Sequence, residues 1–336
     1  MGSKKYDIIV VGAGHAGCEA ASACARRGHP TLLLTGNVDR IAHMSCNPAI
    51  GGLGKGHLVR EMDAMGGLMG KVADATGIQF RKLNTKKGAA VQGTRCQSDM
   101  YAYSKKMRQI LEGQENLDIK QGVVGQLLQE QGKIIGVETE MGEKFFADAV
   151  VITAGTFMRG LCHIGLKQFP GGRIPDFTAV ALSQSLLDLG IELGRLKTGT
   201  VPRVDAKTID FSELPEQWGD TPLPRFSFWN VPAELKQICC HITYTNSQTH
   251  DIIRENLDQS PIYTKVISST GPRYCPSIED KIHRFADKDR HQIFLEPVAL
   301  GTNEIYPNGL STSLPYEVQL KFLRTIPGLE NVEIIR

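Results

Sequence analysis

The chain has 336 residues, of which 41% are hydrophobic and 22% are charged. This composition is ordinary for a globular protein, and it excludes a disordered, collagen-like or coiled-coil chain. Lys and Arg together number 38 and Asp and Glu 36, so the net charge of +2 argues neither for nor against a nucleic-acid partner. The length leaves room for two domains with sizeable hydrophobic cores.

The sequence opens without a charged and apolar leader, and none of its apolar runs is long enough to cross a membrane. We therefore expect a cytoplasmic protein with no membrane association. Its eight cysteines are scattered and form no Cys-x-x-Cys pair, which argues against a disulfide framework and a structural zinc site. Cys239, Cys240 and His241 fall in an alternating strand pattern, so we predict one buried strand face there and no metal.

Strand and helix patterns alternate along the first half of the chain. We predict a strand at 6–11, a helix from the following glycine turn through Arg27, and a strand at 31–35. A helix at 101–112, a strand at 118–124, a hairpin of 127–137 with 144–146, a strand at 149–155 and a helix at 180–189 follow. The stretch from 47 to 70 is crowded with glycines, and we assign no regular element to it.

The character of the sequence changes between Lys197 and about Pro272, where prolines are frequent and segments such as 238–245 alternate. We interpret this stretch as a β-rich module inserted into the first domain. Beyond it we predict a strand at 292–296, a helix at 316–325 and a strand at 332–335. The predicted domains are 1–196, with a helical and hairpin excursion at about 95–147, then the inserted module at 197–272 and a return to the first domain at 273–336.

The first predicted strand ends in a glycine turn that consists of Gly12, Ala13, Gly14, His15, Ala16 and Gly17. Gly12 permits the turn, Gly14 lets the backbone approach a pyrophosphate, and Gly17 lets helix and strand pack closely. The start of the helix then offers free N–H groups to the phosphates. Because the turn follows a strand and opens a helix, it predicts a dinucleotide site; the alternative is a plain strand-to-helix turn.

One feature departs from the usual dinucleotide pattern. The acidic residue expected about 20 residues further on is absent, because the second strand ends at Thr35 and the next acid is Asp39. The strand at 149–155 favours FAD over NAD by analogy, since many FAD-binding folds return such a strand beside the cofactor. We therefore predict an α/β fold with a FAD-binding Rossmann-like domain of the glutathione-reductase type and an inserted β-rich module.

Two loop cysteines are candidates for chemistry. Cys46 precedes a glycine-rich loop that is not a nucleotide P-loop, because Ala49 replaces its first glycine and Gly56 follows the lysine where Ser or Thr belongs. Cys275 is flanked by prolines and lies two residues after Arg273. An exposed thiol beside a cation favours the reactive thiolate. The alternative for both is a buried structural thiol.

Several longer motifs resemble the MnmG (GidA) family of FAD-dependent enzymes, which modify the wobble uridine of certain tRNAs. The motifs are GAGHAG at 12–17, MSCNPAIGG at 44–52, GKGHLVRE at 54–61, GIQFRKLN at 77–84, GRLKTGT at 194–200, GPRYCPSIEDK at 271–281 and HQIFLEP at 291–297. The resemblance implies that, with the GTPase MnmE, the enzyme adds a (carboxymethyl)aminomethyl group to carbon 5 of the uridine. Methylenetetrahydrofolate supplies the one-carbon unit, NADH reduces FAD, and family members resemble homodimers.

The resemblance also assigns residues. The turn at 12–17 and Val124 bind FAD, and Cys46 and Cys275 match the two essential cysteines. One thiolate adds to carbon 6 of the uracil, which makes carbon 5 nucleophilic, and the other acts as an acid, a base or a handler of the methylene group. The NAD segment comprises Gly271, Pro272, Arg273, Tyr274, Cys275, Pro276, Ser277, Ile278, Glu279, Asp280, Lys281, Ile282, His283, Arg284 and Phe285.

A loose group of cations is expected to contact tRNA: Lys86, Lys87, Arg95, Lys105, Lys106 and Arg108. The alternative for this group is a solvated face. Family members continue past residue 336 into a helical C-terminal domain, so we expect this chain alone to hold FAD weakly and to have little activity. Competing hypotheses are a folate-dependent tRNA methyluridine methyltransferase, a non-catalytic fragment that binds tRNA or the GTPase, and a generic NADH–flavin or disulfide oxidoreductase.

Overall fold

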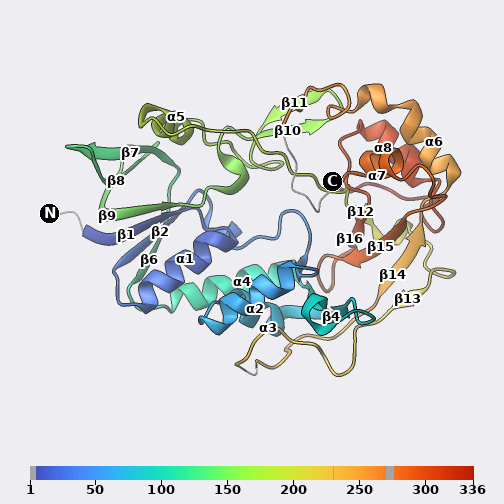
Figure 1. Ribbon diagram of the computed structural model, residues 1–336, viewed down its shortest axis with the longest axis horizontal. Coiled ribbons are helices and arrows are strands. Elements are labelled where there is room, and N and C mark those ends of the chain that lie inside the picture. Colours follow the sequence, from blue (N-terminus) through green and yellow to red (C-terminus); the bar gives the residue numbers. More distant parts are fainter. Residues whose placement is uncertain (1–4, 230, 270–275) are drawn as a thin grey trace.

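The computed structural model describes residues 5–229, 231–269 and 276–336. It contains two units that each have a sheet and a core of their own (Figure 1). The first unit contains the N-terminal strand and most of the first 190 or so residues, and the second is formed by the chain beyond about residue 200. Among the described residues, no helix is long and apolar enough to cross a membrane.

The sheet of the first unit has six strands. In spatial order they are β6 (Leu117–Gln121), β2 (Thr31–Thr35), β1 (Lys5–Val11), β9 (Lys144–Ile152), β8 (Lys133–Thr139) and β7 (Val124–Glu130). The first four are parallel, and β8 and β7 continue the sheet antiparallel. Parallel strands that alternate with helices in this order confirm the predicted Rossmann-like α/β fold.

Helices α1 (His15–Arg26) and α4 (Met100–Glu112) cover one face of this sheet (Figure 1). Helix α1 buries its small residues, such as Cys18 and Ala21, and α4 buries Met107 in the same core. The side chain of Asp99 caps α4 by accepting from the N–H groups of Tyr101 and Ala102. An Asp at this position satisfies otherwise unpaired N–H groups, which explains why the helix begins where the sequence predicts.

The glycine-rich stretch after residue 47 is more regular than expected. It contains α2 (Lys55–Ala64) and α3 (Met69–Thr76), and a small antiparallel sheet lies beside them, in the order β3 (Ala49–Gly51), β5 (Gly93–Ser98) and β4 (Gly77–Leu83). Gly56 is needed inside α2 because a Cβ there would lie 2.7 Å from the carbonyl oxygen of Thr94. Gly56 is therefore required by close packing of the helix against a strand, which a local pattern does not reveal.

The second unit is built on an antiparallel sheet of five strands. Their order is β12 (Val204–Asp205), β16 (Glu304–Asn308), β15 (Gln292–Pro297), β14 (Cys240–Tyr244) and β13 (Glu216–Gln217). Helices α6 (Ser247–Glu255), α7 (Ile278–Arg284) and α8 (Tyr316–Leu323) pack with it. Ile278, Leu295 and Phe322 share one buried core with Val204 and Ile253. The described part of 273–336 therefore belongs to this unit, which differs from the expected return to the first domain.

Smaller elements complete the described chain. These are β10 (Leu161–Ile164), β11 (Lys167–Pro170), α5 (Ala181–Asp188) and the 3-10 turns η1 (Val38–Arg40), η2 (Ala89–Val91), η3 (Gly155–Phe157), η4 (Ala206–Thr208) and η5 (Leu257–Gln259). Some predicted boundaries differ: β9 unites 144–146 with most of 149–155, and the predicted strand at 118–124 ends at Gln121. The predicted strand at 332–335 is reduced to a single bridge between Val204 and Ile334.

A segment that we call the strap, residues 217–238, leaves the second sheet after β13, crosses to the first unit and returns to β14 (residue 230 lies outside the described residues). Its Phe226 side chain is fully buried in the core of the first unit. The carboxylate of Asp74 accepts from the N–H groups of Phe226 and Ser227 at 3.0 and 2.8 Å. The N–H of Phe228 donates to Asp63 at 2.8 Å. The strap thus ties the two units together through one aromatic anchor and buried carboxylates.

Replacing this anchor tests the role of the strap. Phe226→Ala removes a fully buried ring, and we expect a loss of about 3–5 kcal/mol in the free energy of unfolding, measured by urea denaturation. Phe228→Ala is the matched control, because that ring is 59% exposed and contacts the Arg60 guanidinium, a contact worth about 1 kcal/mol or less. Equal losses in the two variants would contradict the anchoring role.

Candidate active site

The glycine turn between β1 and α1 is tightly constrained on its protein side. Gly12 has φ +98°, and a Cβ there would lie 2.5 Å from the carbonyl oxygen of Thr153. A Cβ on Gly17 would lie 1.7 Å from the carbonyl oxygen of Gly12, so position 17 accepts only glycine. The Thr153 hydroxyl donates to the carbonyls of Val11 and Gly12 at 2.9 and 2.8 Å. The turn is therefore held rigidly between β1 and the end of β9.

The other side of the same turn is open, and it suits an anionic group. A Cβ built on Gly14 meets no atom within 4 Å. Gly14 is the N-cap of α1 and provides no side-chain cap, and the first turn of the helix carries no acid. The first N–H groups of α1 are thus free to bind phosphate oxygens. These features fit the pyrophosphate of a dinucleotide cofactor.

His15 and Ala13 lie on the buried side of the turn. Burial lowers the pKa of His15, so its imidazole is neutral near pH 7. Its Nε2 atom is buried and has no hydrogen-bond partner among the described residues, and its ring lies 5.5 Å from that of Tyr103. Such an unpaired buried nitrogen is costly in the protein alone.

Val124 lies apart from the turn at the start of β7. Its side chain is 3% exposed and packs in the core with Leu34, so any ligand contact that it makes is through its backbone. The end of β2 lacks the acid of the usual pattern, and the next acid along the chain, Asp39, is paired with Arg108 at 2.9 Å.

Cys46 lies where the two units meet. The thiol is half-buried and donates to the carbonyl oxygen of Gly199 at 3.1 Å. Its sulfur is 3.9 Å from the hydroxyl oxygen of Tyr306. Gly199 and Tyr306 both belong to the second unit, whereas Cys46 follows η1 of the first. Burial is the main reason why the pKa of Tyr306 is raised, so this phenol is a neutral hydroxyl beside the sulfur.

A buried cation holds the loop that carries this thiol. One terminal nitrogen of Arg203 donates to the carbonyl oxygens of Ser45 and Cys46, both at 2.8 Å. Arg203 is 8% exposed. Its guanidinium carbon lies 4.9 Å from the centre of the Tyr306 ring, and its Nε atom lies 3.9 Å from a carboxylate oxygen of Glu304. Burial lowers the pKa of Arg203, and an arginine still remains charged near pH 7. A positive charge therefore stands beside the backbone of the Cys46 loop.

Sequence analysis did not identify Arg203 or Tyr306 as neighbours of Cys46. Both lie more than 150 residues from the thiol in the sequence. Arg203 lies three residues after the GRLKTGT motif at 194–200, and this position near a motif is the sequence signal that points to it as a site residue.

Only part of the predicted NAD segment lies within the described residues. Residues 271–275, which include Cys275, lie outside the described residues. The structure therefore describes no distance between Cys275 and Cys46. Residues 276–285 form the cap and body of α7, with Ile278 and Ile282 buried in the second core. His283, Arg284 and Phe285 are exposed. The described segment therefore presents its C-terminal end to solvent and buries its start.

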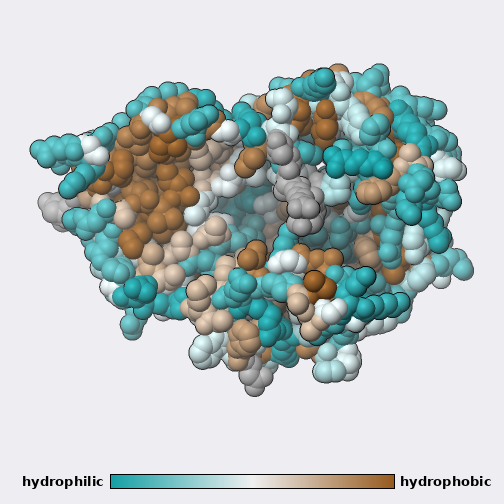
Figure 2. Space-filling view, in the orientation of Figure 1, coloured by the Kyte–Doolittle hydropathy of each residue, from teal (hydrophilic) through white to brown (hydrophobic). Residues whose placement is uncertain are grey.

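The start of α7 is linked to the Cys46 loop by a short series of contacts. Glu279 is completely buried, and its carboxylate accepts from the Thr312 hydroxyl at 2.8 Å and the Ser313 N–H at 3.1 Å. The N–H of Thr312 donates to the carbonyl oxygen of Thr200 at 3.1 Å, and the Thr200 hydroxyl lies 3.5 Å from the carbonyl oxygen of Cys46. The surface is hollowed between the two units (Figure 2).

The six predicted tRNA-contacting cations do not form one free patch. Arg95 points inward and pairs with the buried carboxylate of Glu296 at 2.6 Å. Lys106 pairs with Glu234, and Arg108 pairs with both Glu112 and Asp39. Lys86, Lys87 and Lys105 are exposed and have no ion pair with another described residue. The free charge is thus concentrated on the turn after β4, which carries Lys86 and Lys87.

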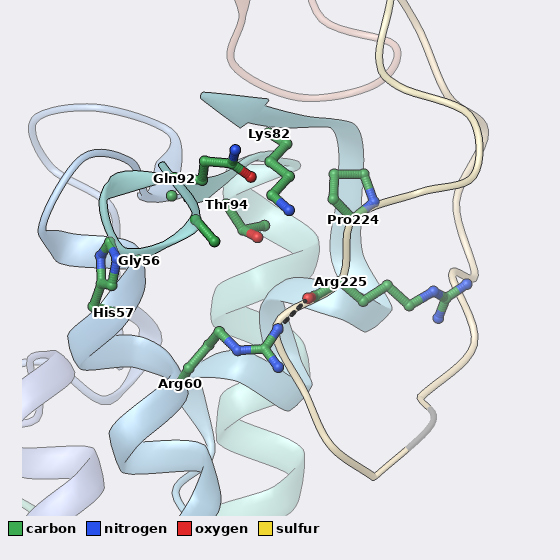
Figure 3. A pocket seen from close by; sticks show the side chains of 10 residues that line it. Gly56, His57, Arg60, Lys82, Gln92, Thr94, Pro224 and Arg225 are labelled. Atoms are coloured by element: carbon green, nitrogen blue, oxygen red, sulfur yellow. Dashed lines mark hydrogen bonds between the residues drawn. The ribbon is translucent and has the colours of Figure 1, made fainter. Parts of the chain in front are cut away.

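This turn borders a cavity that sequence analysis missed. The cavity has a volume of about 380 Å³, and its lining includes the cationic residues Arg60 and Lys82 together with Ala89 and residues 92–94. Figure 3 shows the Lys82 side chain directed toward it and the Arg60 guanidinium below, donating to the Arg225 carbonyl at 3.1 Å. Gln92 both lines the cavity and donates to the carbonyl oxygen of Lys87. The cavity and the basic turn therefore form one cationic surface.

Comparison with known proteins gives a consistent result over almost the whole chain. The chain is 60% identical over 333 residues to the tRNA uridine 5-carboxymethylaminomethyl modification enzyme MnmG of Syntrophotalea carbinolica, covering 99% of this chain and 54% of that protein. It is 59% identical to the MnmG of Geobacter sulfurreducens, covering 53% of it. The chain thus spans about half the length of the curated relatives it matches.

A solved structure gives the same match. The structure of Aquifex aeolicus GidA superimposes with a TM-score of 0.93 at 52% identity, covering 99% of this chain and 57% of that one. The profile of the family described as Glucose inhibited division protein A matches residues 7–336. These matches confirm the resemblance seen in the motifs: the chain belongs to the glucose inhibited division protein A (GidA, MnmG) family.

Proposed function

We propose that this chain carries the cofactor site and one catalytic thiol of a FAD-dependent enzyme that modifies the wobble uridine of tRNA. The product is a uridine with a (carboxymethyl)aminomethyl group on carbon 5. The observation that carries the proposal is the position of Cys46, half-buried at the junction of the two units beside Arg203. The names of the relatives, which are tRNA uridine 5-carboxymethylaminomethyl modification enzymes, support it.

FAD is the proposed cofactor, and the turn at 12–17 is its proposed pyrophosphate site. The open space at Gly14 and the uncapped start of α1 support this assignment. The unpaired Nε2 of His15 is a further proposed contact, and Val124 contributes its backbone. When bound, FAD supplies the redox step, for which NADH is the proposed reductant. The exposed end of α7 at His283, Arg284 and Phe285 is the described part of the proposed NADH segment.

Thiol chemistry explains the need for Cys46. Carbon 5 of uracil is a poor nucleophile on its own. A thiolate that bonds to carbon 6 pushes the electron pair of the 5,6 double bond into an enolate, and carbon 5 then attacks an electrophilic methylene derived from methylenetetrahydrofolate. Glycine or ammonium takes the place of the folate nitrogen on the methylene group. Loss of the carbon 5 proton and elimination of the thiolate restore the double bond. Arg203 holds the loop that carries the Cys46 thiol, and Cys275 is the proposed second thiol.

The basic turn at Lys86 and Lys87, with the cavity beside it, is the proposed phosphate-binding surface for tRNA. Arg60 and Lys82 extend it, whereas Arg95 is excluded because Glu296 neutralises it. The target uridine must leave the anticodon stack to reach a thiol at the junction. We further propose that the whole protein is a cytoplasmic homodimer that works with the GTPase MnmE.

Gly14→Ala tests the cofactor site. The new methyl group meets no protein atom within 4 Å, so stability is expected to stay unchanged. It occupies the space proposed for the pyrophosphate, so the affinity for FAD, measured by flavin fluorescence quenching, is expected to fall at least about tenfold, or by about 1.4 kcal/mol. Gly88→Ala is the control, because that glycine also has open space and lies on an exposed loop. Unchanged FAD affinity in Gly14→Ala would exclude this site.

Trapping with 5-fluorouridine-containing tRNA tests the thiols, because fluorine on carbon 5 prevents the elimination that releases the enzyme. We expect the enzyme with FAD, NADH and folate present to form a covalent adduct, visible as a shifted band in denaturing gels. Either Cys46→Ser or Cys275→Ser is expected to abolish the adduct, and Cys24→Ser is expected to retain it. If both variants still trap the RNA, neither thiol is the nucleophile.

Charge reversal tests the tRNA surface. The double variant Lys86→Glu and Lys87→Glu is expected to weaken tRNA binding and to reduce the slope of log affinity against log salt by about 1–2. Lys133→Glu, an exposed lysine at the start of β8, is expected to leave both quantities close to wild type. An unchanged salt slope in the double variant would place the tRNA elsewhere.

A further inference from the structure

Three side chains with metal-binding atoms converge at the edge of the second sheet. The ligand atoms of Glu216, Cys239 and His241 all lie within 4.8 Å of one another. Glu216 in β13 stands directly opposite His241 in β14. Cys239 is two residues before His241 and therefore projects from the same face, whereas Cys240 between them is buried on the other. The alternation predicted from the sequence is present, and it gathers three potential ligands on the outer face.

Neighbouring groups orient two of these side chains. The indole N–H of Trp218 donates to one carboxylate oxygen of Glu216 at 2.8 Å, which leaves the other oxygen available. The ring of Phe211 lies 4.5 Å from the ring of His241. Such supporting contacts are typical of the residues around metal ligands.

We propose that Glu216, Cys239 and His241 bind a divalent zinc ion, with water in the fourth position. The mixture of thiolate, imidazole and carboxylate suits zinc and not magnesium or calcium, which take oxygen ligands. Zinc bond lengths of about 2.0–2.3 Å in a tetrahedral site place ligand atoms about 3.3–3.8 Å apart. The ligand atoms of the three side chains lie within 4.8 Å of one another, which is close to this range. This site differs from the expectation that the chain holds no metal.

The position of the site indicates what the ion does. Glu216 and Cys239 immediately flank the strap at 217–238, so an ion that joins them closes the strap at its base. Two hydrogen bonds next to this base hold the strap on β4. The Ile238 N–H donates to the carbonyl oxygen of Ile78, and the Gln79 side chain donates to the carbonyl oxygen of Gln217. An ion that joins the two ends of a long loop reduces the conformational freedom of the unfolded chain. The ion is therefore a structural clip that strengthens the attachment of the second unit to the first.

Binding is coupled to loss of one proton. Cys239 must release its thiol proton to the solvent when the metal–sulfur bond forms, and no electron is transferred. Protons therefore compete with the metal for the Cys239 sulfur, and the apparent affinity for the metal is expected to rise with pH. Arg81 and Lys82 lie on the first-unit strand that contacts the strap, and Arg81 donates to the Trp218 carbonyl.

Cobalt(II) provides a direct test, because a thiolate–cobalt bond gives a charge-transfer absorption in the near ultraviolet. The chelator-treated, reduced chain is titrated with cobalt chloride, and then with zinc chloride in competition. We expect a saturable charge-transfer band with one cobalt per chain that zinc removes. Cys239→Ser is expected to abolish the band, and His241→Gln and Glu216→Gln to weaken binding at least tenfold. Cys24→Ser, a half-buried thiol on α1, is the matched control and is expected to keep the band.

A thermal measurement tests the clip. Zinc is expected to raise the melting temperature of the wild-type chain and of Cys24→Ser, but not that of Cys239→Ser, whose melting temperature without metal is expected to match wild type. Absence of the charge-transfer band in the wild type, or its persistence in Cys239→Ser, would overturn the metal site. Cobalt binding that leaves the melting temperature unchanged would overturn the structural role.

Discussion

The guanidinium of Arg203 is the contact on which the arrangement at the junction depends. It is buried between the units and charged, so it must find acceptors, and the backbone carbonyls of Ser45 and Cys46 supply two of them. The Thr200 hydroxyl and the Val201 carbonyl supply two more, at 2.6 and 2.7 Å. The cost of burying a charge is therefore offset only when the Cys46 loop lies against the second unit. One arginine thus determines both the position of the thiol and its electrostatic surroundings.

Apart from the Phe226 anchor, several contacts between the units are hydrogen bonds to buried carboxylates. Arg95 and Asn308 both donate to the buried carboxylate of Glu296, one from each unit. The strap repeats this design with Asp74 and Asp63, whose carboxylates accept backbone N–H groups across the junction. Hydrogen bonds require defined directions and distances, whereas apolar contact tolerates sliding. A junction of this kind keeps the units in one relative position, as a site assembled from both requires.

Much of the first unit follows from local sequence. The glycine turn, the apolar strands 6–11 and 31–35 and the capped helix α4 are recognised because their signals lie within a few residues of one another. Helix α2 was missed because its one glycine, Gly56, is required by contact with Thr94 in β5, nearly 40 residues away. The expected domain of residues 273–336 differs from the observed one, because the sequences of strands β15 and β16 look the same whichever sheet the strands join. Only their pairing with β14 and β12 places them in the second unit.

The sequence by itself determined the type of fold of the first unit, the place where a dinucleotide would bind and the two cysteines worth testing. Each of these depends on residues that are neighbours along the chain, so the pattern and the physical contact coincide. Tertiary structure alone decided that Arg203 and Tyr306 flank Cys46, that Arg95 is neutralised by Glu296, and that Glu216 faces Cys239 and His241. These partners come from segments far apart in the sequence, and they meet only because burying the two cores and pairing the strands bring them together.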